Sequence, residues 1–124
     1  MKMKLAEVLN INQVLKSIID NTNSQIDSLL KFKFLGIMKS METPISNFEI
    51  IRNDKILEFG KETEDGNVRI DQEDKETMEN FNKALSEILG SEVKVDIEKI
   101  KSDDIFNKGI SAEYLMVLYP IIEA

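Results

Sequence analysis

The chain has 124 residues and a formal net charge of −7, and it contains neither cysteine nor histidine. Hydrophobic residues make up 42% and charged residues 31%, enough apolar material for one core, so we expect a single domain, residues 1–124. Without cysteine and histidine, the chain has no disulfides, no thiolate or imidazole zinc site and no catalytic pair built on those side chains. We therefore expect no enzyme activity, no cofactor and no metal.

The charge is spread unevenly along the chain. Residues 1–60 carry 8 Lys and Arg against 7 Asp and Glu, whereas residues 61–124 carry 8 against 16. The acidic half repels phosphate, so we do not expect generic nucleic-acid binding. Charges interrupt the apolar runs, and the first residues lack the apolar core of a signal peptide, so we expect no membrane contact. The expected location is the cytoplasm or, in a second interpretation, the inside of a virion.

Two helices are expected in residues 1–60. Asn10 or Asn12 is expected to cap the first helix, and the stretch DNTNS, residues 20–24, predicts a turn. The second helix is expected to begin near Asn23 or Ser24. Its core face follows helical spacing: Ile26, Leu29, Leu30, Phe34, Ile37, Met38 and Met41. Pro44 follows Thr43, which indicates either a new helix with Thr43 as its cap or a kink in one long helix.

A stripe with heptad-like steps runs from residue 41 to residue 59, and Gly60 is expected to end its helix. Its members are Met41, Ile45, Phe48, Arg52, Ile56 and Phe59. An arginine on an apolar stripe needs a partner, because unpaired burial of its charge is costly. Two interpretations are open: a salt bridge to Glu49 or Glu58, or contact with a partner carboxylate or a ligand phosphate, supported by Lys55 and Arg69.

The acidic segment KETEDGNVRIDQED spans residues 61–74. A calcium loop centred on Gly66 would place Lys61 first and Gln72 last, where carboxylates are required, so that interpretation fails. Asp65-Gly66 predicts a tight turn before a short strand at 67–70. The acids form either a solvated turn and helix start or an acidic partner surface that imitates phosphate. That surface would consist of Glu64, Asp65, Asp71, Glu73 and Asp74.

The C-terminal half alternates helices and strands. Asp71 or Asp74 is expected to cap a helix over 75–89 that ends at Gly90. Residues 92–100 alternate as a strand with one solvated side, which we expect to pair with 67–70. The pair Asp103-Asp104 is interpreted as a helix cap before Ile105 and not as an acid–base pair. Ser111 is expected to cap a last short helix that Pro120 bends or ends.

Lysines and apolar residues suggest two kinds of binding. In KFKFL, residues 31–35, Lys31 and Lys33 flank aromatic residues, either as snorkelling side chains beside core rings or as a basic ligand site. The residues from 24 to 59 are more apolar than one buried stripe requires. We therefore expect a homo-oligomer or an obligate partner. The whole chain predicts a helix-rich α+β fold, with a long helical hairpin in 1–60, a small antiparallel β element and a short C-terminal helix.

The chain resembles a family of short phage and prophage proteins of uncharacterised function. The matching pieces are IIRNDKILEFGKE, EDGNVRI, FNKALSEIL, SEVKVDIEKI and ISAEYLMVLYPII. The resemblance covers most of the chain, implies a phage origin and brings no catalytic residues.

These observations lead to one functional hypothesis and one alternative. The hypothesis is a non-catalytic counter-defence inhibitor that binds a host defence protein stoichiometrically or sequesters a nucleotide signal. A small anionic ligand or partner would be bound by cations from several positions: Arg52, Lys55, Arg69, Lys31 and Lys33. The alternative is a structural protein of the virion or of tail assembly. Small size, helical self-association and the lack of catalytic side chains fit both.

Overall fold

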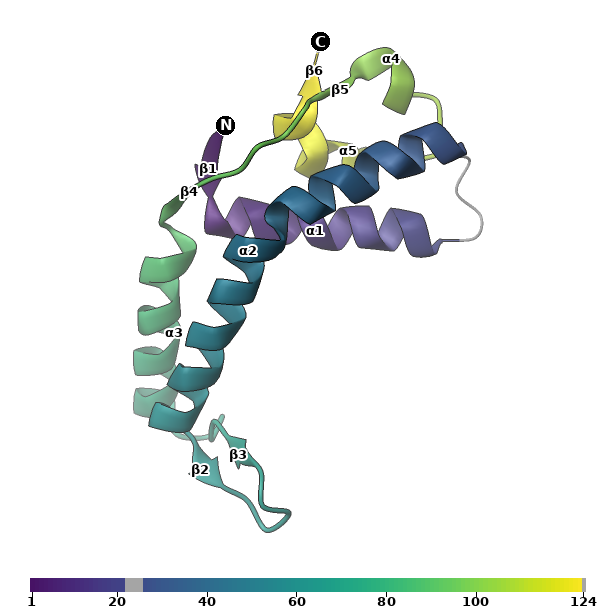
Figure 1. Ribbon diagram of the computed structural model, residues 1–124. Coiled ribbons are helices and arrows are strands. Elements are labelled where there is room, and N and C mark those ends of the chain that lie inside the picture. Colours follow the sequence, from purple (N-terminus) through teal and green to yellow (C-terminus); the bar gives the residue numbers. More distant parts are fainter. Residues whose placement is uncertain (22–25, 124) are drawn as a thin grey trace.

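The computed structural model describes residues 1–21 and 26–123, and it confirms the expected helix-rich α+β fold. The helices form two parts that meet at an angle (Figure 1). We call residues 1–21, 26–43 and 92–123 the head, and residues 44–90 the arm. The long helix α2, Ser28–Phe59, belongs to both and connects them. The other elements of the head gather around its first half, while the helix α3, Lys75–Leu89, runs beside its second half.

The first helix, α1, spans Leu5–Asp20 and follows a short strand, β1, at Lys2–Lys4. The expected cap at Asn10 or Asn12 is wrong, because both residues lie inside the helix. The apolar face already begins at Leu5, and the backbone N–H of Lys4 donates to Glu7 Oε1 at 3.3 Å. The buried face of the helix has helical spacing: Leu5, Val8, Ile11, Val14, Leu15 and Ile18.

The start of α2 also differs from the sequence prediction. The helix begins at Ser28, and the carboxylate of Asp27 caps it by accepting from the backbone N–H of Leu30 at 2.8 Å. An aspartate near the true start therefore takes the role expected of Asn23 or Ser24. Those two residues and most of the expected turn at 20–24 lie outside the described residues.

Pro44 lies inside α2, and the helix continues through it to Phe59. Of the two alternatives for this position, the kinked long helix is the one observed, and Thr43 is not a cap. A proline removes one N–H donor from the helix and its ring presses against the preceding turn, which bends the axis. Figure 1 shows the change of direction in the middle of α2. This bend is what separates the arm from the head.

The arm is a pair of helices with a hairpin at its end. Asp74 caps α3 as expected, its carboxylate accepting from the backbone N–H of Thr77 at 3.2 Å, and Gly90 ends the helix. The rings of Phe59 and Phe81 meet edge to face with centroids 6.4 Å apart. Strands β2, Lys61–Glu62, and β3, Val68–Arg69, form the hairpin.

The expected pairing of residues 67–70 with residues 92–100 is wrong. The strand β3 pairs with β2, while β4, Glu92–Lys94, pairs antiparallel with β1. The 15 residues of α3 separate the two segments by roughly 22 Å along the helix axis. The turn at Gly66, whose φ is +82°, instead folds β3 back onto β2 as a hairpin.

The single long strand expected over 92–100 is interrupted. Only β4 and β5, Ile100–Lys101, are strands, and β5 pairs in parallel with β6, Ile122–Glu123. The alternation itself is correct, because Val95 is buried and Val93 and Ile97 are half-buried. Residues 95–99 therefore continue the chain between two strand pairs without belonging to either.

Three short helical segments complete the head: α4, Ser102–Ile105; α5, Ala112–Leu118; and the 3-10 helix η1, Tyr119–Ile121. Ser111 caps α5 as expected, its hydroxyl accepting from the backbone N–H of Tyr114 at 3.3 Å. The capping role expected for Asp103-Asp104 is wrong, because both lie within α4 and Lys101 occupies the cap position. No helix in the described parts of the chain is long and apolar enough to cross a membrane.

Candidate binding surfaces

The head contains a groove with a volume of about 700 Å³. One wall is the first half of α2, which contributes Phe32, Lys33, Gly36 and Ile37. The other wall is the extended segment 96–99, with Lys101, Asp104 and Glu123 at one end. We call this feature the head groove. The groove lies between the first half of α2 and the segment that joins β4 to β5.

The head groove combines an apolar surface with charges of both signs. The ring of Phe32 is 74% exposed, and a Cβ added at Gly36 would meet no atom within 4 Å. Three lysines and four carboxylates line the groove. One pair is joined, since Lys33 Nζ lies 3.4 Å from Asp104 Oδ2. Because the carboxylates outnumber the lysines, the groove does not favour a multiply charged anion.

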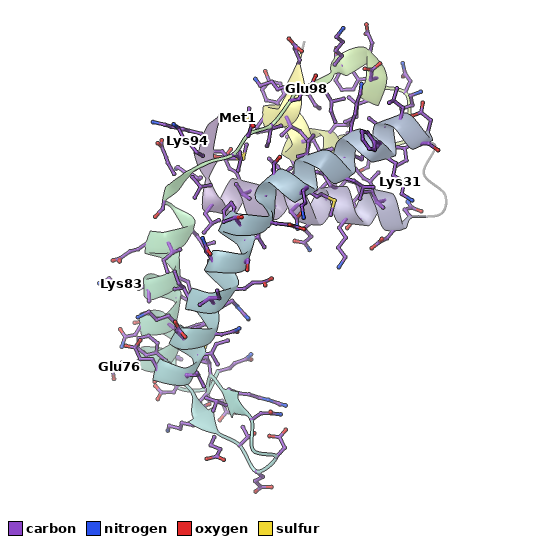
Figure 2. The ribbon with its side chains drawn as sticks, viewed as in Figure 1. Met1, Lys31, Glu76, Lys83, Lys94 and Glu98 are labelled. Atoms are coloured by element: carbon purple, nitrogen blue, oxygen red, sulfur yellow. The ribbon has the colours of Figure 1, made fainter. Side chains whose placement is uncertain are left out.

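The residues of the KFKFL segment lie partly in the core and partly on the surface. Phe34 is buried in the core, whereas Phe32 points outward, so the interpretation of both rings as core residues is wrong for Phe32. Helical spacing explains the split, because residues two apart lie on nearly opposite sides of a helix. The same spacing separates the two lysines. Figure 2 shows Lys31 on the side of α2 away from the segment that carries Glu98, so only Lys33 lines the head groove.

A second candidate surface lies on the arm. Ile50 and Leu57 are 58% and 65% exposed and stand seven residues apart, on one face of α2. Phe48, at nearly the opposite angle around the helix axis, is buried. We call Ile50 and Leu57 the outer arm face. The described elements that pack on this half of α2, α3 and β3, leave both side chains exposed.

Arg52 does not occupy a buried position on the stripe. It is exposed, and within the described residues it forms no ion pair, so the expected salt bridge to Glu49 or Glu58 is wrong. Glu58 is instead bound by Lys55, whose Nζ lies 2.8 Å from its Oε2. The reason is the width of the arm: two helices bury the centre of their interface and leave its edges open to water.

The five basic residues proposed for an anionic ligand do not converge. Lys33 and Arg52 are separated by 19 positions of α2, on the order of 28 Å along a straight helix. Arg69 lies in the hairpin at the far end of the arm and is bound to Asp65, with 3.1 Å between its guanidinium and Oδ2. The structure therefore does not bring Lys31, Lys33, Arg52, Lys55 and Arg69 into one site.

Three of the five acids at the end of the arm stabilise local structure. Asp65 accepts from the hydroxyl of Thr63, from the backbone N–H of Asn67 at 3.3 Å and from the guanidinium of Arg69. Asp71 accepts from the backbone N–H of Glu73 at 3.0 Å, and Asp74 caps α3. Glu64 and Glu73 are exposed. These contacts favour the interpretation of a solvated turn and helix start over a dedicated binding surface.

The hydrogen bonds change the acidity of two of these groups. The Thr63 hydroxyl, followed by the backbone N–H of Asn67, lowers the pKa of Asp65. The Thr77 hydroxyl, followed by the backbone N–H of Thr77, lowers the pKa of Asp74. Each donor favours the ionised carboxylate that accepts from it. No group of three or more carboxylates suited to holding a metal ion occurs among the residues described.

The chain was also compared with known proteins. It matches no protein-family model, no curated protein and no solved structure.

Proposed function

We propose that this protein acts by binding another protein stoichiometrically and not by catalysing a reaction. Following the resemblance to short phage proteins, the proposed form is a phage-encoded counter-defence inhibitor that binds a host defence protein in the host cytoplasm. The observation that carries the proposal is the outer arm face, where Ile50 and Leu57 are exposed on one side of a projecting helix.

Exposure of the Ile50 and Leu57 side chains to water is unfavourable in free energy. Single exposed apolar residues are common on proteins, but two that share one helix face offer a partner two contacts about 10 Å apart. A partner groove that covers such a face removes the exposed part of both side chains from water, which contributes about 1–2 kcal/mol for each. Helices recognised in this way present anchors at positions such as i and i+7, the spacing of Ile50 and Leu57.

The geometry gives less support to sequestration of a nucleotide signal. A phosphate group needs several cations or backbone donors within reach of one another. The basic residues are instead divided between the head, the middle of the arm and its tip, and two of them are already paired with carboxylates of the arm. A protein surface is the ligand that better fits the outer arm face.

Assembly of copies of this chain, as in a virion or tail component, is the second candidate. It is supported by further exposed apolar side chains on the first half of α2, which extend the contact available to another copy: Leu29, Phe32 and Leu35. Such a protein would form a homo-oligomer through α2, and the outer arm face would bind a second copy in place of a host protein.

Native mass spectrometry distinguishes these forms. The protein is purified from a host that expresses defence systems, as the wild type and as Ile50→Ser/Leu57→Ser. The matched control is Phe106→Ser/Met116→Ser, which removes exposed apolar side chains of the head. We expect a complex of fixed stoichiometry with one host protein, lost in the first variant and kept in the control. Thermal unfolding checks that both variants fold.

Each other outcome overturns the proposed form. A discrete oligomer of this chain alone, dissociated by Ile50→Ser/Leu57→Ser, would establish self-assembly instead. Small-molecule mass that disappears in Arg52→Ala would establish the sequestration form. A complex that survives Ile50→Ser/Leu57→Ser but not the control would move the contact to the head.

A further inference from the structure

We propose that the head groove binds an extended peptide segment of another protein as an added β-strand along residues 96–98. The segment would place an apolar side chain between Phe32 and Gly36 and a basic side chain near Asp96 and Glu98. This surface is separate from the outer arm face, so the inference does not depend on the function proposed above.

The backbone hydrogen bonds show where an added strand would pair. The N–H of Leu5 donates to the carbonyl of Ser91 at 2.9 Å, and the N–H of Val95 donates to the carbonyl of Met1 at 2.9 Å. In an antiparallel pair only alternate residues point their backbone groups at the neighbouring strand. Residues 91, 93 and 95 therefore face β1. Where the chain stays extended, Asp96 and Glu98 direct their N–H and C=O groups to the opposite edge.

That opposite edge is unpaired in the middle of the segment. On either side of it, β4 is bonded to β1 and β5 is bonded to β6. Within the described chain, no hydrogen bond reaches the backbone N–H or C=O of Asp96, Ile97 or Glu98. Figure 2 shows this stretch, from Lys94 to Glu98, running along the rim of the head. An unpaired edge of extended backbone is a template for another strand.

The wall that faces this edge leaves room for side chains. Gly36 contributes none, and the neighbouring Phe32 presents a ring that is 74% exposed. Ile37 lines the base of the groove and belongs to the core. The volume of about 700 Å³ lies within the range of protein ligand pockets, roughly 300–1,000 Å³. Strand addition supplies affinity through the backbone, and a pocket of this kind selects the side chain of every second residue.

The charges of the groove indicate which charge a bound peptide segment should carry. Asp96 and Glu98 are two residues apart, so they share one face of the extended segment, and neither forms an ion pair with a described residue. At the other end Lys33 is bound to Asp104, and Lys101 has Glu123 as its register partner. Lys99 and Lys101 form no ion pair with a described residue, so the unpaired charges of the groove are three carboxylates and two lysines. The acidic end therefore favours a lysine or arginine in the bound segment.

Amide hydrogen exchange measured by NMR with two synthetic octapeptides tests the proposal. The probes are acetyl-KVTVKVTV-amide and acetyl-EVTVEVTV-amide, each added at up to about 1 mM. We expect the basic peptide to slow exchange of the amides of Asp96 and Glu98 by about tenfold or more and to leave the amide of Ile97 unchanged. The acidic peptide is expected to bind about tenfold more weakly or worse.

Two variants of α2 locate the binding site. Gly36→Leu adds a side chain at a position where a Cβ meets no atom within 4 Å, and it improves helix propensity, so it is expected to fold and to weaken the basic peptide about tenfold or more. Lys39→Leu adds a similar side chain on α2 outside the groove and is expected to bind as the wild type does. The proposal is wrong if the basic peptide leaves the amides of Asp96 and Glu98 unchanged, if both peptides bind equally, or if Gly36→Leu binds normally.

Discussion

The head and the arm share one helix but are built differently. In the head, α2 packs on α1, which α5 also contacts, whereas in the arm α2 packs on α3 and the hairpin strand β3. Of the buried apolar residues in the described chain, only Phe48 and Phe81 belong to the arm. Phe81 also lies outside the main core cluster. The difference shows that a continuous helix can join a fully covered core to a much thinner interface.

The thinner interface of the arm affects how readily it opens. Local opening requires least free energy where few apolar side chains are buried. The arm therefore opens more readily than the head, although both use the same α2 and similar spacing of apolar residues. Substitutions and acidification should therefore affect the two regions differently.

Removing a core ring from the head should destabilise the whole protein. Phe34 is completely buried in the main core cluster. We expect Phe34→Ala to lower the free energy of unfolding by about 3–5 kcal/mol, because it loses buried area and leaves a cavity. Urea unfolding followed by circular dichroism measures the change. A loss below about 1 kcal/mol would show that the head is not the stable part of the molecule.

Removing the central ring of the arm should have a local effect. Phe81→Ala deletes the partner of Phe59 and the one buried side chain of α3. We expect a loss of roughly 3 kcal/mol that is confined to opening of the arm. Hydrogen exchange should accelerate at the amides of α3 and stay unchanged at those of α1. Equal acceleration in both helices would mean that head and arm unfold as one unit.

Substituting alanine for Gly36, inside α2, and for Gly60, just after its end, should change the stability of the protein in opposite directions. A Cβ at Gly60 would lie 2.4 Å from the carbonyl oxygen of Ile56 and 2.7 Å from Val68 Cγ1. Gly60→Ala is therefore expected to cost about 1–3 kcal/mol as the hairpin is pushed from the helix end. Gly36→Ala, with open space around it, is expected to gain up to about 1 kcal/mol from helix propensity. Thermal unfolding compares them, and two changes of the same sign would contradict the prediction.

Acidification should loosen the arm tip before the head. The folded pKa values of Asp65 and Asp74 are lowered by hydrogen bonds from Thr63 and Thr77. Their stabilisation is therefore complete above the unfolded pKa, near 4, and is lost as the pH falls through the lower folded values. The protection of the hairpin and α3 amides against exchange, relative to their chemical exchange rates, should decrease below about pH 4. Asp65→Asn/Asp74→Asn should reduce this dependence, whereas Glu64→Gln, which removes an exposed carboxylate of the same turn, should keep it.

The candidate surfaces were only partly predictable. Lys33 was identified from the sequence and does line the head groove, and the outward position of Phe32 follows from its spacing to Phe34. Asp96 and Glu98 were assigned only to the solvated side of a strand. Their place beside α2 depends on two strand pairs, β1 with β4 and β5 with β6, that join distant parts of the chain. No local pattern specifies such partners.

Features that arise within a few residues could be predicted from the sequence. The turn at Gly66 and the cap of α5 at Ser111 were predicted, and the cap of α3 was narrowed to Asp71 or Asp74, of which Asp74 is observed, because each depends on side-chain hydrogen bonds or backbone preferences of its neighbours. The strand partners, the exposure of Arg52 and the opening of the head groove follow from tertiary packing. These depend on how many layers cover each segment, which is a property of the whole packed chain.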